Sequence, residues 1–227
     1  MDLTKFNILL GDITKLKFDA IVNAANTSLL GGGGVDGTIH RASGSRLLEE
    51  CKQLGGCMTG QSKITQSYNL TYNDIYWIIH TVGPIFRNHG SEEKYLRRSY
   101  SSALKVAANY AHIYLEQSLN IVNNQLYRFN ITGFIGNKKK ETIISEIEDY
   151  IKSHPIRSLA FPSISTGAYG YPLNDASKIA LEEILSFINE HPDTFEDVSM
   201  ICYDQKTFDI YNNQYDKSNI KSISDFS

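Results

Sequence analysis

The stretch LLGGGGVDGTIH, residues 29–40, places an acid directly after a run of four glycines. Consecutive glycines can adopt positive φ angles and turn their backbone amides toward a ligand. Residues 36–53 have the pattern of a helix, and a glycine loop that leads into a helix N-terminus is an anion site, because free amides and the helix dipole point at the same place. Asp36 lies where a bound phosphate would repel it, so its presence needs an explanation.

The composition is that of a globular protein without a strong charge bias. The 227 residues are 41% hydrophobic and 21% charged, which is enough apolar material for a sizeable core. The formal net charge of −3 provides no positive field, so we expect no direct nucleic-acid partner. No apolar run is long enough to span a membrane and the start shows no signal-peptide pattern, so we expect no membrane partner. We also expect a monomer.

The cysteines point to a reducing compartment. Cys51, Cys57 and Cys202 are odd in number and have no CxxC spacing. This pattern argues against both a disulfide framework and a zinc site. We therefore expect a cytoplasmic protein, with the nucleus as a second location, and no metal. Cys57 is expected to be buried and inert rather than a nucleophile.

Strand and helix patterns alternate along the chain. Short apolar runs predict buried strands at 6–10, 19–24 and 156–164, and further strands are predicted at 61–67, 75–82 and 198–204. Amphipathic patterns predict helices at 36–53, 91–111, with Ser91 as N-cap, and 173–190. Helices between strands imply a parallel or mixed sheet covered on both faces. Such sheets bind ligands beyond the carboxyl ends of their strands.

One region interrupts the alternation. Residues 112–155 begin with a polar, Asn-rich stretch and then show helical spacing in Ile143, Ile144, Ile147, Tyr150 and Ile151. We expect a helical insertion, ended by Pro155, in a single domain that spans residues 1–227. The lysine run at 138–140 is expected to face solvent, with a basic docking patch as the alternative. The polar residues 211–227, with a tail at about 214–227, are expected to add little to the core.

Further motifs follow the predicted strands. GDIT (11–14) follows the first strand, NAAN (23–26) the second, HTVGP (80–84) a middle strand and PSISTGAYGYP (162–172) a later one. We expect all of them to lie at the rim of one cleft. Together with GGGGVDG, in this order, they resemble the macrodomain family, and most closely its MacroD-type branch of ADP-ribosyl hydrolases. The resemblance covers about residues 5–110 and 156–213.

The resemblance implies a fold, a ligand and a reaction. The fold is α/β, a three-layer α/β/α arrangement with a central mixed sheet and a cleft for ADP-ribose. The reaction is the hydrolysis of ADP-ribose from acidic side chains of mono-ADP-ribosylated proteins, together with deacetylation of O-acetyl-ADP-ribose. Neither a cofactor nor a metal is implied.

The resemblance also assigns binding residues. Asp12 would accept a hydrogen bond from the adenine amino group, with Ile13 beside it, although a turn cap explains Asp12 nearly as well. Asn26 would bind a ribose hydroxyl and Asn23 would brace the loop. The walls around the diphosphate would be Gly31, Gly32, Gly33, Gly34 and Val35 on one side and the amides of Ser165, Thr166, Gly167, Ala168 and Tyr169 on the other. Such loops can hold two phosphates without a lysine or arginine.

Three aromatic residues complete the expected site. Tyr169 would cover the distal ribose, and Tyr203 or Phe208 would pack on the adenine. For Tyr203 and Phe208, packing in the core is an equal alternative. His80 is expected to be a hydrogen-bonded histidine at a strand end, and His40 and Arg41 have no expected role.

Asp36 could serve in catalysis if it faces the distal ribose rather than the phosphates. There it could accept a hydrogen bond from a water over the anomeric carbon, and repulsion from the phosphates would raise its pKa and improve it as a base. Asp36 and Asn26 are therefore the expected catalytic pair. The alternative is a helix N-terminal acid that the dipole favours. Whether Asp36 takes the proton or only orients the water stays open.

Other functions explain the motifs less well. A non-catalytic ADP-ribose reader and an ADP-ribose 1″-phosphate phosphatase are the main alternatives. Gly32, Gly34 and Gly37 satisfy the dinucleotide pattern G-x-G-x-x-G, but NAANTSLL separates them from the strand and no acid follows about 20 residues later. A serine hydrolase is disfavoured because the chain has no G-x-S-x-G motif.

Overall fold

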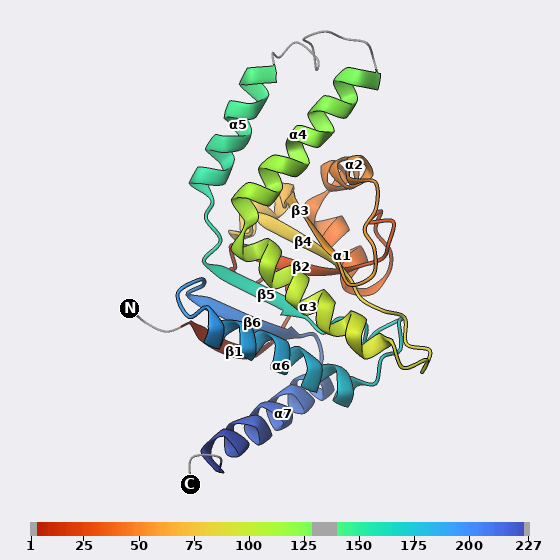
Figure 1. Ribbon diagram of the computed structural model, residues 1–227, viewed down its shortest axis with the longest axis vertical. Coiled ribbons are helices and arrows are strands. Elements are labelled where there is room, and N and C mark those ends of the chain that lie inside the picture. The colour runs from red at the N-terminus through yellow and green to blue at the C-terminus, as the bar shows by residue number, and fades with distance from the viewer. Residues whose placement is uncertain (1–3, 129–139, 225–227) are drawn as a thin grey trace.

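The computed structural model describes residues 4–128 and 140–224, and a six-stranded sheet runs through its centre (Figure 1). The strands are β1 (Lys5–Leu10), β2 (Ala20–Ala25), β3 (Ser62–Gln66), β4 (Trp77–Val82), β5 (Ser158–Pro162) and β6 (Asp197–Cys202). Their order is β1-β6-β5-β2-β4-β3. Every neighbouring pair is parallel except β3 and β4, which are antiparallel, so the sheet is mixed as expected.

Helices cover both faces of this sheet. They are α1 (Gly34–Ser43), α2 (Ser45–Leu54), the short 3-10 helix η1 (Tyr68–Asn73), α3 (Glu92–Ala108), α4 (Tyr110–Arg128), α5 (Lys140–Ser153), α6 (Leu173–Glu190) and α7 (Gln205–Ser224). Side chains alternate across each strand, so Ile21 packs with the α1 and α2 side, whereas Ala20 and Val22 pack with the α3 and α6 side. The result is the three-layer α/β/α fold. Within the described residues, no helix is both long and apolar enough to cross a membrane.

Three expectations about these elements were wrong in part. The helix expected at 36–53 is two helices, because Gly44 adopts a φ of +82° between α1 and α2. Strand β1 is not buried, because it is an edge strand and Leu10 is 47% exposed. Ser91 makes no side-chain cap at the start of α3; the Glu92 carboxylate instead accepts hydrogen bonds from the backbone amides of Arg87 and His89.

The C-terminal residues contribute more to the core than expected. Helix α7 continues through Ser224, and Tyr211 on it is fully buried. The Tyr211 hydroxyl lies 2.9 Å from the Ser163 hydroxyl, directly after β5. The expectation that residues 211–227 add little to the core is therefore wrong for Tyr211, which links α7 to the sheet.

The Asn-rich stretch, for which no helix was expected, forms α4, and α4 and α5 lie side by side beyond the sheet (Figure 1). Tyr114, Ser118 and Val122 recur every four residues on α4 and are buried. Trp77 contacts the rings of Tyr114 and Tyr150 edge-on, with centroids 4.8 and 5.0 Å apart. We propose that the segment is an insertion into one domain, with its base built into the domain core. Of the lysine run, Lys138 and Lys139 lie outside the described residues.

The base of α4 also satisfies the exposed edge of the sheet. The Gln117 side chain donates to the Ile64 carbonyl over 2.8 Å and accepts from the Ile64 amide over 3.4 Å. It occupies the place of a further strand beside β3. An edge strand with such a cover is protected from pairing with another chain.

Tyr114→Ala tests whether the base of α4 belongs to the core. Tyr114 is only 5% exposed, so its removal should lower the free energy of unfolding by about 3 kcal/mol, the scale for a large aromatic side chain in a core. The measurement is urea unfolding. Tyr72, which is 90% exposed, supplies the matched control Tyr72→Ala, and equal stability of the two variants would contradict the assignment.

Candidate active site

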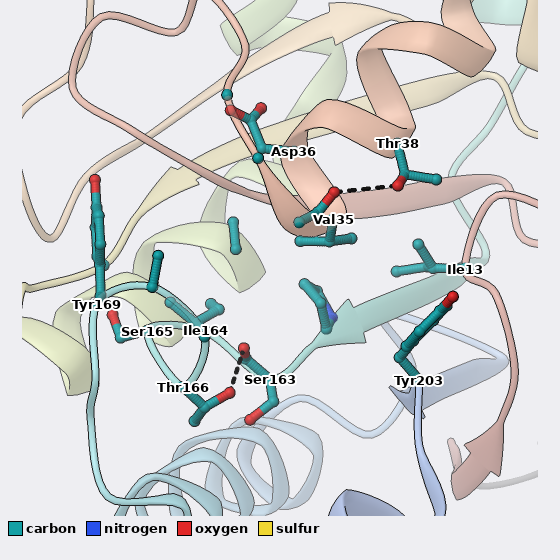
Figure 2. A pocket seen from close by; sticks show the side chains of 18 of the residues that line it. Ile13, Val35, Asp36, Thr38, Ser163, Ile164, Ser165, Thr166, Tyr169 and Tyr203 are labelled. Atoms are coloured by element: carbon teal, nitrogen blue, oxygen red, sulfur yellow. Dashed lines mark hydrogen bonds between the residues drawn. The ribbon is translucent and has the colours of Figure 1, made fainter.

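A cavity of about 610 Å³ opens where the parallel strands end. Its lining comes from the segments after β1, β2, β4, β5 and β6 and from the first turns of α1. It therefore lies at the carboxyl edge of the sheet, where the motifs were expected to meet. Figure 2 places Asp36 and Tyr169 on one side of this cavity and Ile13 and Tyr203 on the other.

The glycine loop forms the wall on the α1 side. Gly34 has a φ of +59°, a conformation that other residues rarely adopt, at the point where α1 begins. Gly37, one turn further on, has no room for a Cβ because the Gly32 carbonyl oxygen occupies that place. These glycines let the start of the helix lie directly against the loop. The arrangement fits an anion site at a helix N-terminus.

The loop after β5 forms the opposite wall. Ser165 has a φ of +67° and is buried, and its hydroxyl has no hydrogen-bond partner among the described residues. The Thr166 hydroxyl donates to the Ser163 carbonyl over 3.1 Å and holds the turn (Figure 2). Gly83 must lack a side chain, because a Cβ there would collide with Ser165 and Ile164. Backbone strain of this kind collects at functional sites.

Asp36 is the buried acid of the cavity, with 4% exposure. Asn23 Nδ2 donates to its Oδ1 over 2.7 Å, and His40 Nε2 lies 3.5 Å from the same oxygen. Burial raises the pKa of Asp36 above its ordinary value, and the bond from Asn23 and the nearby His40 oppose that shift. Burial likewise lowers the pKa of His40. Asp36 is thus a buried, weakly solvated carboxylate rather than one half of a strong ion pair.

Behind Asp36 lies a group of nitrogen and sulfur atoms that resembles a metal site. His40, Cys51 and His80 place one donor atom each within 4.8 Å of one another. Both ring nitrogens of His80 are already in hydrogen-bond contact, with Asn23 and Thr65. Burial raises the pKa of the Cys51 thiol to about 12, which disfavours the thiolate that a metal requires. The group fits hydrogen-bonded packing better than a metal site.

Most of the expected site residues line this one cavity. They are Asp12, Ile13, Asn26, Gly32, Gly33, Gly34, Val35, Asp36, Ser165, Thr166, Gly167, Ala168, Tyr169 and Tyr203. Tyr203 stands at the mouth and is 83% exposed. His80 is hydrogen-bonded on β4 and Cys57 is buried, both as expected. The roles given to the lining residues remain predictions.

Two expected residues, Phe208 and Gly31, are not among the lining residues. A third, Asn26, already uses its side-chain amide in hydrogen bonds within the protein. Phe208 packs against the core on the α7 side instead of reaching the cavity. Gly31 is not among the lining residues, and its carbonyl accepts a hydrogen bond of 2.8 Å from Asn26 Nδ2. Asn26 Oδ1 in turn accepts from the Ser28 amide and hydroxyl. Asn26 therefore braces the glycine loop, a role the sequence suggested for Asn23.

Several lining residues were missed from the sequence. Thr38 and Arg41 follow Gly34 on α1 at intervals of about one turn and also line the cavity, and this helical spacing was the available signal. Arg41 donates to the Thr38 hydroxyl over 3.1 Å. Arg41, to which the sequence analysis gave no role, therefore lines the cavity, and the prediction that backbone amides hold the phosphates stays a prediction.

The Macro domain family profile matches residues 22–114 and 134–180, more than half of the chain. The chain belongs to the macrodomain family. A macro domain-containing protein of Chlorobaculum tepidum is 40% identical to this macrodomain over 88% of the chain and 89% of its own length. The ADP-ribose glycohydrolase MACROD2 of Xenopus laevis is 40% identical over 91% of this chain, which spans 39% of the frog protein. The O-acetyl-ADP-ribose deacetylase 1 of Pantoea vagans is 37% identical over 91% of this chain and 96% of its own.

Solved macrodomains share the same architecture. The Oceanobacillus iheyensis macrodomain with ADP superposes with a TM-score of 0.72 at 31% identity, over 97% of this chain and 94% of that one. The Trypanosoma brucei macrodomain in complex with ADP-ribose gives a TM-score of 0.66 at 33% identity, over 92% of this chain and 68% of that one.

Asp36→Asn tests the burial of the acid in this macrodomain. Because burial raises its pKa in the folded state, ionisation of Asp36 costs stability once the pH exceeds the unfolded-state pKa of about 4. The variant should therefore be more stable than the unaltered protein at about pH 7, with the difference closing toward about pH 3. Denaturant unfolding across this pH range measures it. The burial argument would be contradicted if the stability of the variant, relative to the unaltered protein, were lower at neutral pH than at acid pH.

Proposed function

We propose that this macrodomain is a mono-ADP-ribosyl hydrolase that removes ADP-ribose from acidic side chains, without a metal or a cofactor. The observation that carries the proposal is a buried carboxylate, Asp36, at the end of the cavity away from Tyr203. The names of the frog and Pantoea relatives support a hydrolase, and that of the Pantoea relative extends the proposal to O-acetyl-ADP-ribose.

The cavity offers a separate place for each part of ADP-ribose. Asp12 Oδ1 accepts from the Thr14 amide and hydroxyl as a turn cap, and Oδ2 remains for the adenine amino group, with Lys15 3.8 Å away. Ile13 and Tyr203 lie near each other at this end of the cavity (Figure 2). The diphosphate would lie between the glycine loop and the strained Ser165 loop. The distal ribose would then reach Asp36 and Tyr169.

The chemistry follows from the environment of the acid. With its pKa raised, the Asp36 carboxylate accepts a hydrogen bond from a water over the anomeric carbon. The water oxygen bonds to that carbon while the bond to the ester oxygen breaks, and the electron pair leaves with the carboxylate of the acceptor protein. The water proton goes to Asp36 or to a phosphate oxygen of the substrate. Binding of the remote adenosine holds the reacting carbon in place.

A buried acid distinguishes this proposal from that of a non-catalytic reader. A like charge near a bound diphosphate weakens binding and brings a reader no advantage. In a hydrolase the same charge is a base. The second enzymatic alternative, a phosphatase acting on ADP-ribose 1″-phosphate, would place a further anion against Asp36, which the buried carboxylate disfavours.

ADP-ribose should bind with micromolar affinity or better, equivalent to about −8 kcal/mol. AMP should bind much more weakly, because it reaches only the adenine end and one of the two loops. Isothermal titration calorimetry compares the two ligands directly. Equal affinities would contradict the assignment of the diphosphate and distal ribose to the inner part of the cavity.

Asp36→Ala should lower the rate of hydrolysis of an ester-linked, mono-ADP-ribosylated protein by roughly 100-fold or more, the scale for a positioned base. Affinity for ADP-ribose should hold or improve, because a like charge has been removed from the vicinity of the phosphates. Asn26→Ala should lower both the rate of hydrolysis and the affinity for ADP-ribose, since Asn26 braces the glycine loop. Single-turnover release and calorimetry on the same variants measure this. Normal turnover in Asp36→Ala would make the acid structural.

A further inference from the structure

The support of Asp36 extends across three strands beneath α1. Asn23 on β2, His80 on β4 and Thr65 on β3 are all fully buried. The pairing register places Asn23 beside His80, and the side chains of all three point to the α1 face of the sheet. Asn23 Nδ2 lies 2.7 Å from Asp36 Oδ1 and 3.1 Å from His80 Nδ1, and His80 Nε2 lies 2.9 Å from Thr65 Oγ1.

The proton positions along this series follow from chemistry. A carboxylate only accepts, so the atom of Asn23 that faces Asp36 must be the amide nitrogen. The same nitrogen has a second N–H toward His80, so Nδ1 of that ring must accept. The proton of the neutral ring is then on Nε2 and is donated to Thr65. Burial lowers the pKa of His80 to about 3, in accord with a neutral ring.

We propose that Asn23, His80 and Thr65 are positioning residues that fix the orientation of the Asp36 carboxylate and keep it ionised for attack. The proposal rests on the proposed function, in which Asp36 orients the water. His80 acts through Asn23: by accepting one N–H, it prevents the amide from rotating and presenting its oxygen to Asp36. Thr65 acts through His80, because its hydroxyl accepts the Nε2–H and holds the ring in the orientation in which Nδ1 faces the Asn23 amide.

Among the described residues, no lysine or arginine pairs with Asp36: Arg41, which lines the same cavity, donates to the Thr38 hydroxyl. The titratable groups around Asp36 are His40 on its own helix, Cys51 on α2, His80 on β4 and Tyr169 on the loop after β5. Burial lowers the pKa of His40 and raises those of Cys51 and Tyr169, so each of them favours its neutral form. The hydrogen bond from the Asn23 amide is therefore the main contact that opposes the effect of burial on the pKa of Asp36, ahead of His40.

The strand alternation supplies a matched control. Thr81 follows His80 on β4, so its side chain points to the opposite face of the sheet, where its hydroxyl lies 2.9 Å from that of Ser62. Thr81→Val removes a buried hydroxyl from the same strand pair as Thr65→Val. Only Thr65→Val breaks the connection to Asp36.

The experiment compares Asn23→Leu, Thr65→Val and Thr81→Val in single-turnover hydrolysis as a function of pH. In Asn23→Leu, turnover should fall by roughly 100-fold, the effect of misplacing a reacting group by about 1 Å. The acid limb of its pH profile should move to higher pH, because the bond that lowers the pKa of Asp36 is lost. Thr65→Val should lower turnover relative to Thr81→Val, which should match the unaltered protein. A uniform loss without a pH shift in Asn23→Leu would overturn the proposal, and so would equal turnover in the two threonine variants.

Nitrogen-15 NMR of the histidine rings provides a readout that does not depend on activity. The His80 signal, identified by its loss in His80→Gln, should show the Nε2–H tautomer and should not titrate between about pH 5 and about pH 9. An Nδ1–H tautomer or a titrating ring would overturn the proposal even if Asn23→Leu fails to fold. Asp36→Asn distinguishes failure of the proposed function from failure of the positioning role. Normal turnover in that variant would remove the proposed function, whereas its loss together with unaltered turnover in Thr65→Val would remove only the positioning role.

Discussion

The structure around the cavity depends on one hydrogen bond, from Asn23 Nδ2 to the carboxylate of Asp36, 2.7 Å long and buried. A buried carboxylate without a donor costs several kcal/mol, so α1 must bring Asp36 down to the central strand β2. That approach requires the helix start to lie against the preceding loop. Gly37 makes it possible, because any Cβ there would strike the Gly32 carbonyl oxygen. The glycine run therefore makes room for the helix start, and this brings Asp36 within hydrogen-bond distance of Asn23 on the sheet.

The parallel sheet brings the other lining segments to the same place as Asp36. Because five parallel strands end at one edge, segments far apart in the sequence meet there, and Asp12, Asp36 and Ser165 line one cavity. Each of these residues has a structural partner or a strained backbone: Asp12 caps a turn, Asp36 is held by Asn23, and Ser165 has a positive φ. The rigid sheet supports the strain at the loops. The carboxylate lies at the opposite end of the cavity from Tyr203, and in the proposed function this separates adenine recognition from chemistry.

The sequence predicted what local pattern and motif order determine, namely the strands, the α6 helix, the three-layer fold and most of the cavity lining. It missed features that depend on distant partners. Strand β1 has the apolar pattern of a buried strand, yet its position at the edge is a property of the whole sheet. The Asn-rich α4 buries only every fourth residue, such as Tyr114, against Trp77, and no local pattern reveals that partner. Tyr203 and Phe208 are five residues apart in the sequence. Tyr203 follows β6 and lines the cavity, whereas Phe208 lies on α7 and is not among the lining residues. The sequence pattern did not show where α7 begins. Asn23 and Asn26 occur in the same motif, but Asn23 bonds to Asp36 and contacts His80, 57 residues away, whereas Asn26 bonds to the nearby Gly31 carbonyl.

The central claim is that Asp36 directs water to the anomeric carbon rather than to the ester carbonyl. Hydrolysis of an ester-linked, mono-ADP-ribosylated peptide in ¹⁸O-labelled water distinguishes the two, since the attacking oxygen stays on the atom it attacks. Mass spectrometry of the released peptide is the decisive measurement, because its carboxyl group does not exchange with water under these conditions. The account predicts a peptide without the label, with the labelled oxygen on ADP-ribose. A labelled carboxyl group on the peptide would show attack at the carbonyl and would contradict the account.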